Sequence, residues 1–250
     1  MTAATRVDVA FTPLDIRPHQ VAVVVDVLRA SSTIVAALKA GCRRVLCTAS
    51  VERARRLRAP GRLLAGERGC RRIDDFDRGN SPRALDFVPA DELVLCTTNG
   101  TPAILAAVSL ADEVLIGSLL NLSALIEAIP AGKDVTVVCA GTDGCFALED
   151  AYVAGRIVQR LGAARTDAAL AAEQLARAYA DPTEPLARSA NGAVLRATQQ
   201  AADIAFCARE STAAVVPKVS TATAEVAVVS VAEPAGSSAK IHRSLLKDIA

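Results

Sequence analysis

The chain has 250 residues, a formal net charge of +1, 52% hydrophobic residues and no tryptophan. Near-neutral charge gives no reason to expect nucleic acid or an anionic membrane as a partner, and no apolar run of about 18 residues predicts a transmembrane helix. The length allows one large domain or two small ones with a substantial core. Abundant small aliphatic residues favour an enzyme built from helices and a sheet over an aromatic recognition module.

The seven cysteines show no C-x-x-C pair with zinc-like spacing. Most of them stand at the ends of apolar runs, where cysteine behaves as a small buried hydrophobe. The first residues lack the charged start and apolar stretch of a signal peptide. We therefore expect a reduced, cytoplasmic protein.

Short apolar runs alternate with helical patterns over the first two thirds of the chain. Strands are predicted at 21–28, 43–48, 61–66, 93–98, 113–118 and 134–141, and helices at 33–40, 51–57, 103–107, 123–128 and 146–161. Thr101 and Pro102 are expected to cap and begin the third of these helices. Continuous hydrophobicity suits parallel strands covered on both faces, and the alternation implies right-handed crossovers. The predicted fold is α/β, a three-layer α/β/α arrangement with a mostly parallel sheet.

The last third of the sequence changes character. Residues 167–208 are Ala-rich and helical in pattern, and we expect them to form a helical cap. Two late strands are predicted at 212–217 and 224–234, followed by a short terminal helix in the tail. We interpret residues 1–250 as a single domain.

Three predicted strands end in the same kind of loop, at 26–33, 96–101 and 139–144. Each loop offers hydroxyl groups or glycine N–H groups directly before a helix, and a helix N-terminus attracts anions. Because ligands bind at the carboxyl ends of strands in open α/β sheets, we expect the loops to share one anion site. The candidate anion-binding residues in them are Ser31, Ser32, Thr97, Thr98, Asn99, Gly100, Thr101, Gly141 and Thr142.

Carboxylates stand beside these loops. Asp26 interrupts a run of valines, where burial is costly unless a cation or hydrogen bonds compensate it. Arg29 is its local partner, so Asp26 is either half of a buried ion pair, a capping residue or a metal ligand. Glu149 and Asp150 open a helix, where they either favour the helix dipole or bind a cation.

Two further segments complete the candidate site. Residues 65–69 place Glu67 and Arg68 between glycines, and the polar turn 76–82 carries Asn80. Mg²⁺ is held by one or two carboxylates together with water and substrate phosphate. We therefore predict a Mg²⁺ site with ligands drawn from Asp26, Glu67, Glu149 and Asp150. The arginine-rich stretch 43–83 either attracts a small anion or forms a solvated basic surface.

Two other phosphatase patterns are excluded. The D-x-D-x-T motif of haloacid-dehalogenase phosphatases fails because Leu28 stands where the second Asp is required. Cys47 and Arg53 have C-x5-R spacing, but the loop between them has no glycine that would let several N–H groups approach a phosphate. The two histidines, His19 and His242, lie outside all the candidate loops and are poor general bases.

Taken in order, the segments VVVDVLRASSTIVAAL, LLAGERG, DRGNSP, TTNGT, GSLLN, CAGTDGCFALEDAYVAG and SANGAVLRATQQAADIAFCA resemble the 2-phosphosulfolactate phosphatase (ComB-type) family. The resemblance covers about residues 7–217 and leaves 218–250 as a C-terminal extension. It implies an α/β homodimer that uses Mg²⁺ to convert 2-phospho-3-sulfolactate into 3-sulfolactate and phosphate, on a route to coenzyme M. Asp143 departs from the family pattern, where asparagine is expected more often.

The residues and the resemblance imply the same chemistry. The substrate would be a compact polyanion whose phosphoryl charge Mg²⁺ offsets. It would face Arg29, which is catalytic together with Asp26, and Arg68, which is a binding residue. Water activated on the metal is the expected nucleophile, with direct attack by Asp26 as the alternative. A phosphatase for another small phosphorylated hydroxy acid and a non-catalytic anion-binding protein are the alternative functions.

Overall fold

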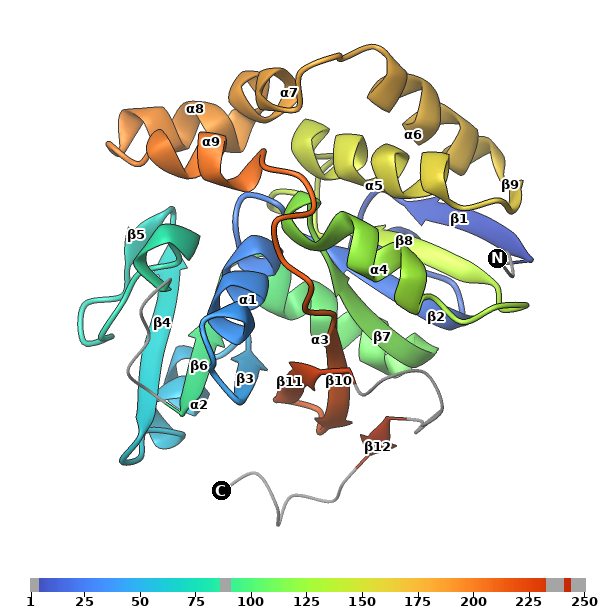
Figure 1. Cartoon of the computed structure of the whole chain (residues 1–250). Helices are drawn as coiled ribbons and strands as arrows, with labels where there is room; N and C mark the ends of the chain where they lie inside the picture. The colour runs from blue at the N-terminus through green and yellow to red at the C-terminus, as the bar shows by residue number, and fades with distance from the viewer. Residues whose placement is uncertain (1–4, 86–90, 233–240, 244–250) are drawn as a thin grey trace.

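The computed structural model describes residues 5–85, 91–232 and 241–243 (Figure 1). Within them lies one twelve-stranded sheet with helices on both faces, which confirms the predicted three-layer α/β/α fold. The strands are β1 Arg6–Ala10, β2 His19–Val25, β3 Arg44–Thr48, β4 Arg62–Arg68, β5 Arg71–Arg72, β6 Glu92–Cys96, β7 Ala111–Gly117, β8 Val135–Cys139, β9 Ala164–Arg165, β10 Pro217–Ala222, β11 Ala227–Val231 and β12 His242–Arg243. The helices are α1 Ala30–Lys39, α2 Val51–Arg56, α3 Gly100–Leu110, α4 Leu122–Ala128, α5 Leu148–Arg160, α6 Asp167–Arg177, α7 Thr183–Arg188, α8 Ala190–Ala197 and α9 Ala202–Cys207, with 3-10 turns η1 Pro13–Asp15, η2 Pro82–Leu85 and η3 Leu119–Asn121.

The sheet consists of two parallel groups joined by a hairpin. Strands β4, β6 and β3 form one group, and β7, β2, β8, β1 and β9 form the other. The antiparallel pair β10–β11 lies between β3 and β7. Figure 1 shows the strands of both groups directed toward the region beneath α8 and α9, so their carboxyl ends approach one another there.

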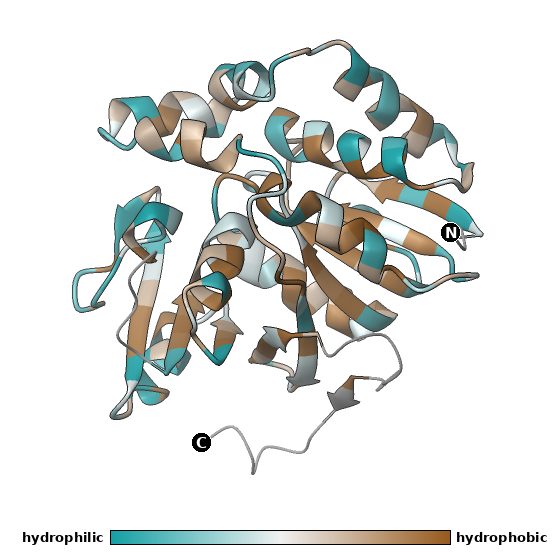
Figure 2. Cartoon of the chain, in the orientation of Figure 1, coloured by the Kyte–Doolittle hydropathy of each residue, from teal (hydrophilic) through white to brown (hydrophobic). Residues whose placement is uncertain are grey.

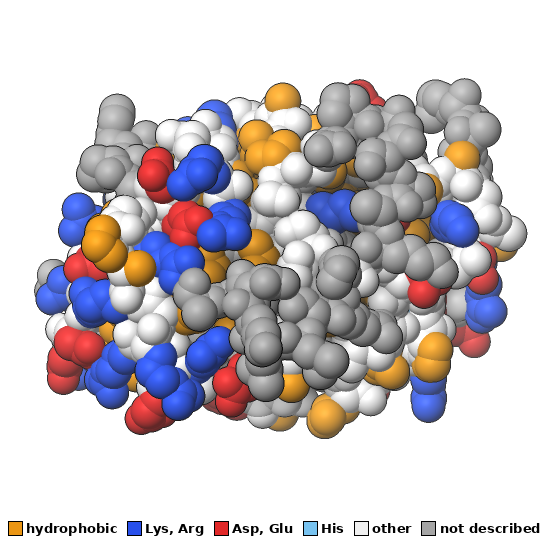
Figure 3. Space-filling model, turned by 90° about the horizontal axis from the view of Figure 1, so that it is seen from below, with side chains coloured by type: hydrophobic (Ala, Val, Ile, Leu, Met, Phe, Trp, Pro, Cys, Tyr) orange, Lys and Arg blue, Asp and Glu red, His pale blue; other side chains and the backbone are white. Residues whose placement is uncertain are grey.

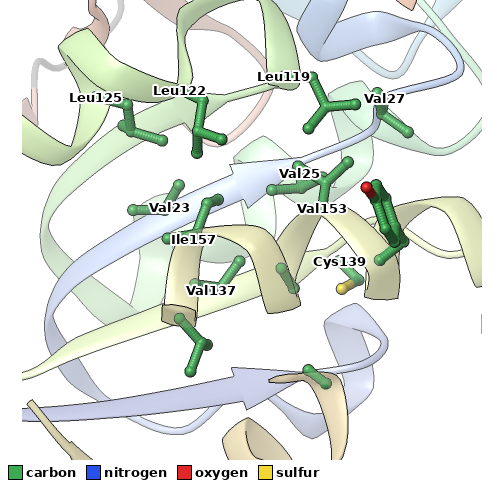
Figure 4. Packing of buried hydrophobic residues seen from close by; sticks show 14 of the residues in the cluster. Val23, Val25, Val27, Leu119, Leu122, Leu125, Val137, Cys139, Val153 and Ile157 are labelled. Atoms are coloured by element: carbon green, nitrogen blue, oxygen red, sulfur yellow. The ribbon is translucent and has the colours of Figure 1, made fainter. Parts of the chain in front are cut away.

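Alternate residues of β2 separate the two faces of the core. Val21, Val23 and Val25 belong to the cluster that includes α4 and α5, and Figure 4 shows Val23 and Val25 beneath the leucines of η3 and α4. Ala22 and Val24 pack instead with α1 and α3. Burial of each such valine contributes about 1.5–3 kcal/mol, which fixes the register of the strand. Figure 2 shows the same pattern as hydrophobic strands inside mixed helices.

Helices α6 to α9 form the predicted cap over this sheet (Figure 1). The cap begins where α6 packs closely against α5. A Cβ atom at Gly155 would lie 2.0 Å from the carbonyl oxygen of Ala172, so only glycine permits this approach. Helix α9 then brings the cap back over the N-terminal end of α1. Residues after 200 thereby reach the carboxyl end of β2.

Two sequence predictions about element boundaries are wrong. The strand predicted at 212–217 begins only at Pro217, because the N–H groups of Ser211 and Ala213 bond to carbonyls of η3 and hold the preceding segment in an irregular path. The helix expected to begin after Thr101 starts at Gly100 with Asn99 as its N-cap. The Thr101 hydroxyl donates back to the carbonyl of Thr97 over 3.0 Å, so this residue is inside the first turn.

The residues after 218, interpreted from the sequence as an extension, contribute to the sheet. Most of β10 and all of β11 lie in this segment, and they fill the gap between β3 and β7. The predicted terminal helix falls mainly on 233–240 and 244–250, outside the described residues, and His242–Arg243 form β12. No helix in the described part of the chain has the length and apolar character needed to cross a membrane.

Candidate active site

The loops after β2, β6 and β8 meet at one place. Asp150 joins two of them, since its Oδ1 accepts the N–H of Val27 over 2.9 Å and its Oδ2 accepts the N–H of Gly141 over 3.1 Å. Asn99 joins the third, because its Oδ1 accepts the N–H of Asp143 over 3.1 Å. The three loops that the sequence singled out therefore surround a common centre.

Asp26 lies at that centre, directly after β2. Its Oδ1 accepts the N–H of Ala30 over 3.1 Å, while its Oδ2 has no hydrogen bond from the described residues. A Cβ atom at Gly100 would lie 2.4 Å from Asp26 Oδ2 and 2.4 Å from Ala30 Cβ. Glycine at position 100 therefore lets the first turn of α3 lie directly against the carboxylate.

The buried acids repel one another. Burial raises the pKa of Asp26 to about 7, with the negative charges of Glu67 and Glu149 adding to the effect and the Ala30 N–H and Arg29 opposing it. Burial, followed by the charges of Glu149 and Asp26, holds the pKa of Asp150 well above its usual range. Burial also raises the pKa of Glu149, against hydrogen bonds that include one from Asn191. This cluster carries more negative charge than its surroundings compensate.

Arg29, 2% exposed, compensates the acidic cluster only in part, because the cap supplies it with an acidic partner of its own. Its Nη1 forms a 2.7 Å ion pair with Asp203 of α9 and donates to the amide oxygen of Gln200. Ser81 donates to the other oxygen of Asp203 over 2.7 Å. The helical cap thus fixes the guanidinium beside Asp26 and satisfies one side of it.

Three buried side-chain atoms in this region have no hydrogen-bond partner in the described structure: Arg29 Nη2, Asn80 Oδ1 and Thr98 Oγ1. The two other buried atoms of this kind, in Arg53 and Glu210, belong to side chains that form ion pairs. Buried polar groups without partners are rare and costly, because each forfeits its hydrogen bond to water. Their concentration in three segments around Asp26 is the signature of a polar ligand site.

Glu67 and Arg68 organise the ends of the strands. The two carboxylate oxygens of Glu67 accept the N–H groups of Cys70 and Thr98, each over 2.8 Å. The guanidinium of Arg68 donates to the carbonyl oxygens of Glu67 and Ala49, over 2.7 and 2.9 Å. Arg68 is thus directed toward the end of β3, and no described contact joins it to Asp26.

Several predicted hydroxyl groups hold the loops in shape. Ser31 donates to the carbonyl of Asp26 over 2.8 Å and Ser32 to that of Val27 over 2.9 Å. Thr97 and Thr101 bond to each other across the first turn of α3. These contacts leave Thr98 as the residue of that loop whose hydroxyl is unpartnered.

Sequence reasoning missed the contribution of the cap. Asp203, Gln200 and Asn191 were not predicted as site residues, although Asn191 donates to Glu149 Oε1 over 2.6 Å and to Thr142 Oγ1 over 2.8 Å. The available signal was polar residues recurring within an Ala-rich segment. An Asp on a small apolar helix, 2% exposed in the fold, calls for a buried cation, which Arg29 supplies.

The residues fit a Mg²⁺ ion of low protein coordination. No group of three or more His, Cys, Asp or Glu in the described ranges is arranged to hold a metal, so the predicted four-carboxylate set does not form a closed cage. The oxygens of Glu67 and Asp150 already accept backbone N–H groups, whereas Asp26 Oδ2 is unpartnered and lies in an undercompensated acidic cluster. Mg²⁺ characteristically needs only one or two such carboxylates, completed by water and phosphate.

The structure supports the exclusion of a Cys47 nucleophile. Cys47 is fully buried in β3, and burial raises the pKa of its thiol far above the usual range. A reactive cysteine needs the opposite shift. None of the seven cysteines, all within the described residues, forms a disulfide.

Comparison with known proteins identifies the family. The model of the 2-phosphosulpholactate phosphatase family matches residues 10–222. A probable 2-phosphosulfolactate phosphatase of Thermotoga petrophila is 38% identical over 215 residues, which cover 84% of this chain and 94% of that protein. The protein of the same description from Thermus thermophilus is 40% identical over 205 residues, 79% of this chain and 86% of the relative. The chain therefore belongs to the 2-phosphosulpholactate phosphatase family of phosphoric monoester hydrolases.

Proposed function

We propose that this chain hydrolyses 2-phospho-3-sulfolactate to 3-sulfolactate and phosphate, with Mg²⁺ as its cofactor. The observation that carries the proposal is the set of unpartnered buried groups around Asp26, namely Arg29 Nη2, Asn80 Oδ1 and Thr98 Oγ1. Two of the three can donate to anionic oxygens, and the third can accept from a protonated oxygen or water. A multiply charged phosphoester offers acceptors for the two donors.

Asp26, Arg29 and the first turn of α3 would bind the phosphoryl group. Arg29 is already oriented by Asp203 and Gln200, so its free Nη2 can donate without reorganisation as charge develops. The N-terminus of α3 at Gly100, next to Asp26, favours negative charge through its aligned N–H groups. Bound at Asp26, Mg²⁺ would offset the acidic cluster and polarise the phosphoryl oxygens.

The attacking group is water in our proposal, with Asp26 as the alternative nucleophile. With Mg²⁺ held at Asp26, the carboxylate would be ionised, and the metal would supply the activation of water. The unpartnered Oδ2 would also suit direct attack. Borohydride added during turnover distinguishes them: it reduces an aspartyl-phosphate so that Asp26 is recovered as homoserine, whereas direct attack by water leaves Asp26 unchanged.

The proposed function is tested by phosphate release from 2-phospho-3-sulfolactate with and without Mg²⁺. We expect turnover that EDTA abolishes and Mg²⁺ restores, and that exceeds turnover of phenyl phosphate. Faster hydrolysis of another phosphorylated hydroxy acid would assign a different substrate. Binding of sulfolactate without phosphate release under any divalent metal would show an anion-binding protein instead.

The proposal extends to three properties expected from the sequence: a role on a route to coenzyme M, a homodimer and a cytoplasmic location. The absence of disulfides among the seven cysteines supports a reducing compartment. Sedimentation equilibrium at micromolar concentration tests the homodimer, which a single species of 25.9 kDa would exclude. Accumulation of 2-phospho-3-sulfolactate after deletion of the gene would support the metabolic role.

A further inference from the structure

A cavity adjoins the reaction centre on its outer side. It has a volume of about 470 Å³ and is lined by residues 70–72, Gly79 and residues 197–200. Its walls therefore come from the β4–β5 turn, the loop before η2 and the end of α8, which Figure 1 shows facing each other. The volume lies within the range of small-molecule sites.

Two arginines of this cavity have no counter-charge. Arg71 and Arg72 are exposed on β5, and their guanidinium groups form no ion pair or hydrogen bond with the described residues. Most other arginines of the 43–83 segment are paired: for example, Arg44 and Arg62 bind Glu92, and Arg55 binds Asp75. Figure 3 shows the molecule from below, on the side away from the cap, where basic and acidic side chains are interspersed. The cavity therefore carries unbalanced positive charge, unlike most of this segment.

The cavity shares a wall with the proposed phosphoryl site. Gln200 lines the cavity, and its amide oxygen accepts from Arg29 while its amide nitrogen donates to the carbonyl of Cys70 over 2.9 Å. The N–H of Cys70 in turn donates to Glu67, beside Asp26. Gln200 therefore stands between Arg29 and the cavity, and its amide contacts both Arg29 and the turn that leads to Arg71 and Arg72.

We propose that this cavity binds the sulfonate group of the substrate through Arg71 and Arg72. The inference rests on the proposed function, since it assigns the part of 2-phospho-3-sulfolactate that does not react. A sulfonate remains ionised at all physiological pH values and offers three acceptor oxygens, which matches two free guanidinium forks. The cavity would therefore distinguish 2-phospho-3-sulfolactate from 2-phospholactate, in which a methyl group replaces the sulfomethyl group.

The test compares the two substrates in Arg71→Gln, Arg72→Gln and the double variant. Loss of each charge-assisted contact should raise KM for 2-phospho-3-sulfolactate about tenfold and leave kcat/KM for 2-phospholactate within about twofold. Arg72→Lys should restore part of the affinity by keeping the charge. Arg56→Gln is the matched control, because Arg56 is an exposed, unpaired arginine on α2 away from the cavity.

Calorimetric titration with 3-sulfolactate and with lactate, in the presence of Mg²⁺, gives a readout that does not need turnover. Wild type should bind sulfolactate at least tenfold more tightly than lactate, and the double variant should lose that preference. Equal effects of the variants on both ligands, or none on either, would overturn the inference. Sulfolactate binding that depends on the two arginines without phosphate release would refute the proposed function and leave this inference standing.

Discussion

Replacement of Asp26 by asparagine should abolish turnover and, in metal-free protein, stabilise the fold at alkaline pH. The pKa of Asp26 in the folded state, about 7, lies above the ordinary value of 3.8 for this carboxyl group. Below pH 3.8 both states are protonated and the contribution to stability is complete; it declines as pH rises and is lost above pH 7. With 1.36 kcal/mol per pKa unit, the ionised carboxylate costs the fold about 4 kcal/mol at pH 8.

Asparagine keeps the shape and the acceptor for the N–H of Ala30 but carries no charge. Asp26→Asn should therefore raise the unfolding free energy by about 4 kcal/mol at pH 8 in EDTA, or Tm by about 8–16 °C for a chain of this size. At pH 4 the two proteins should unfold together. Urea unfolding at both pH values measures this, with Asp134→Asn at an exposed, unpaired position as the control.

Excess Mg²⁺ should reverse the order of stability at pH 8, since a ligand that binds only the native wild type raises its stability by mass action. If Asp26→Asn proves no more stable than wild type in EDTA at pH 8, the assignment of Asp26 as an uncompensated buried charge is refuted. A variant that retains wild-type turnover would separately remove Asp26 from the reaction.

Three further variants test the neighbouring contacts. Asp203→Asn leaves the charge of Arg29 buried without its partner and should cost about 3–5 kcal/mol in urea unfolding; an unchanged midpoint would show that the ion pair is not needed. Gly100→Ala places a Cβ atom 2.4 Å from Asp26 Oδ2 and should lower kcat/KM at least a hundredfold, about 2.7 kcal/mol, so near-normal activity would contradict the close packing. Thr98→Val removes an unpartnered buried hydroxyl, so it should raise KM and lower kcat. The stability of the metal-free protein should stay equal or rise by up to about 1 kcal/mol. Destabilisation without a kinetic effect would make Thr98 purely structural.

The elements that sequence reasoning predicted are those with local signals. The run of valines in β2 predicts a strand buried on both faces, and the polar residues that follow it predict a loop. The start of α3 was misplaced by one turn because Thr101 and Pro102 form a plausible cap, whereas the backbone conformation is determined by the close approach of Gly100 to Asp26. That contact joins two segments distant in the sequence, so no local pattern contains it.

Other features depend on partners far along the chain. Strand β1 has a charged residue in its middle and gains its place only by pairing with β8 and β9. The hairpin of β10 and β11 looks like a terminal addition in the sequence, yet it fills the centre of the sheet. Pairing over such separations is fixed by global packing rather than by propensity.

The cap also determines the charge balance of the site. Asp203 cancels the positive charge of Arg29, so the guanidinium orients donors without changing the net charge of the centre. Burial raises the pKa values of Asp26, Glu149 and Asp150, and the charges of neighbouring carboxylates add to the effect at Asp26 and Asp150. An anionic substrate entering such a cluster would meet repulsion of its own sign, and only a cation bound first or together with it reverses that balance. Substrate and Mg²⁺ are therefore expected to bind cooperatively. Sulfolactate titrated into the protein in EDTA should bind at least tenfold more weakly than in Mg²⁺. Equal affinities would show that the acidic cluster is protonated and carries no opposing charge.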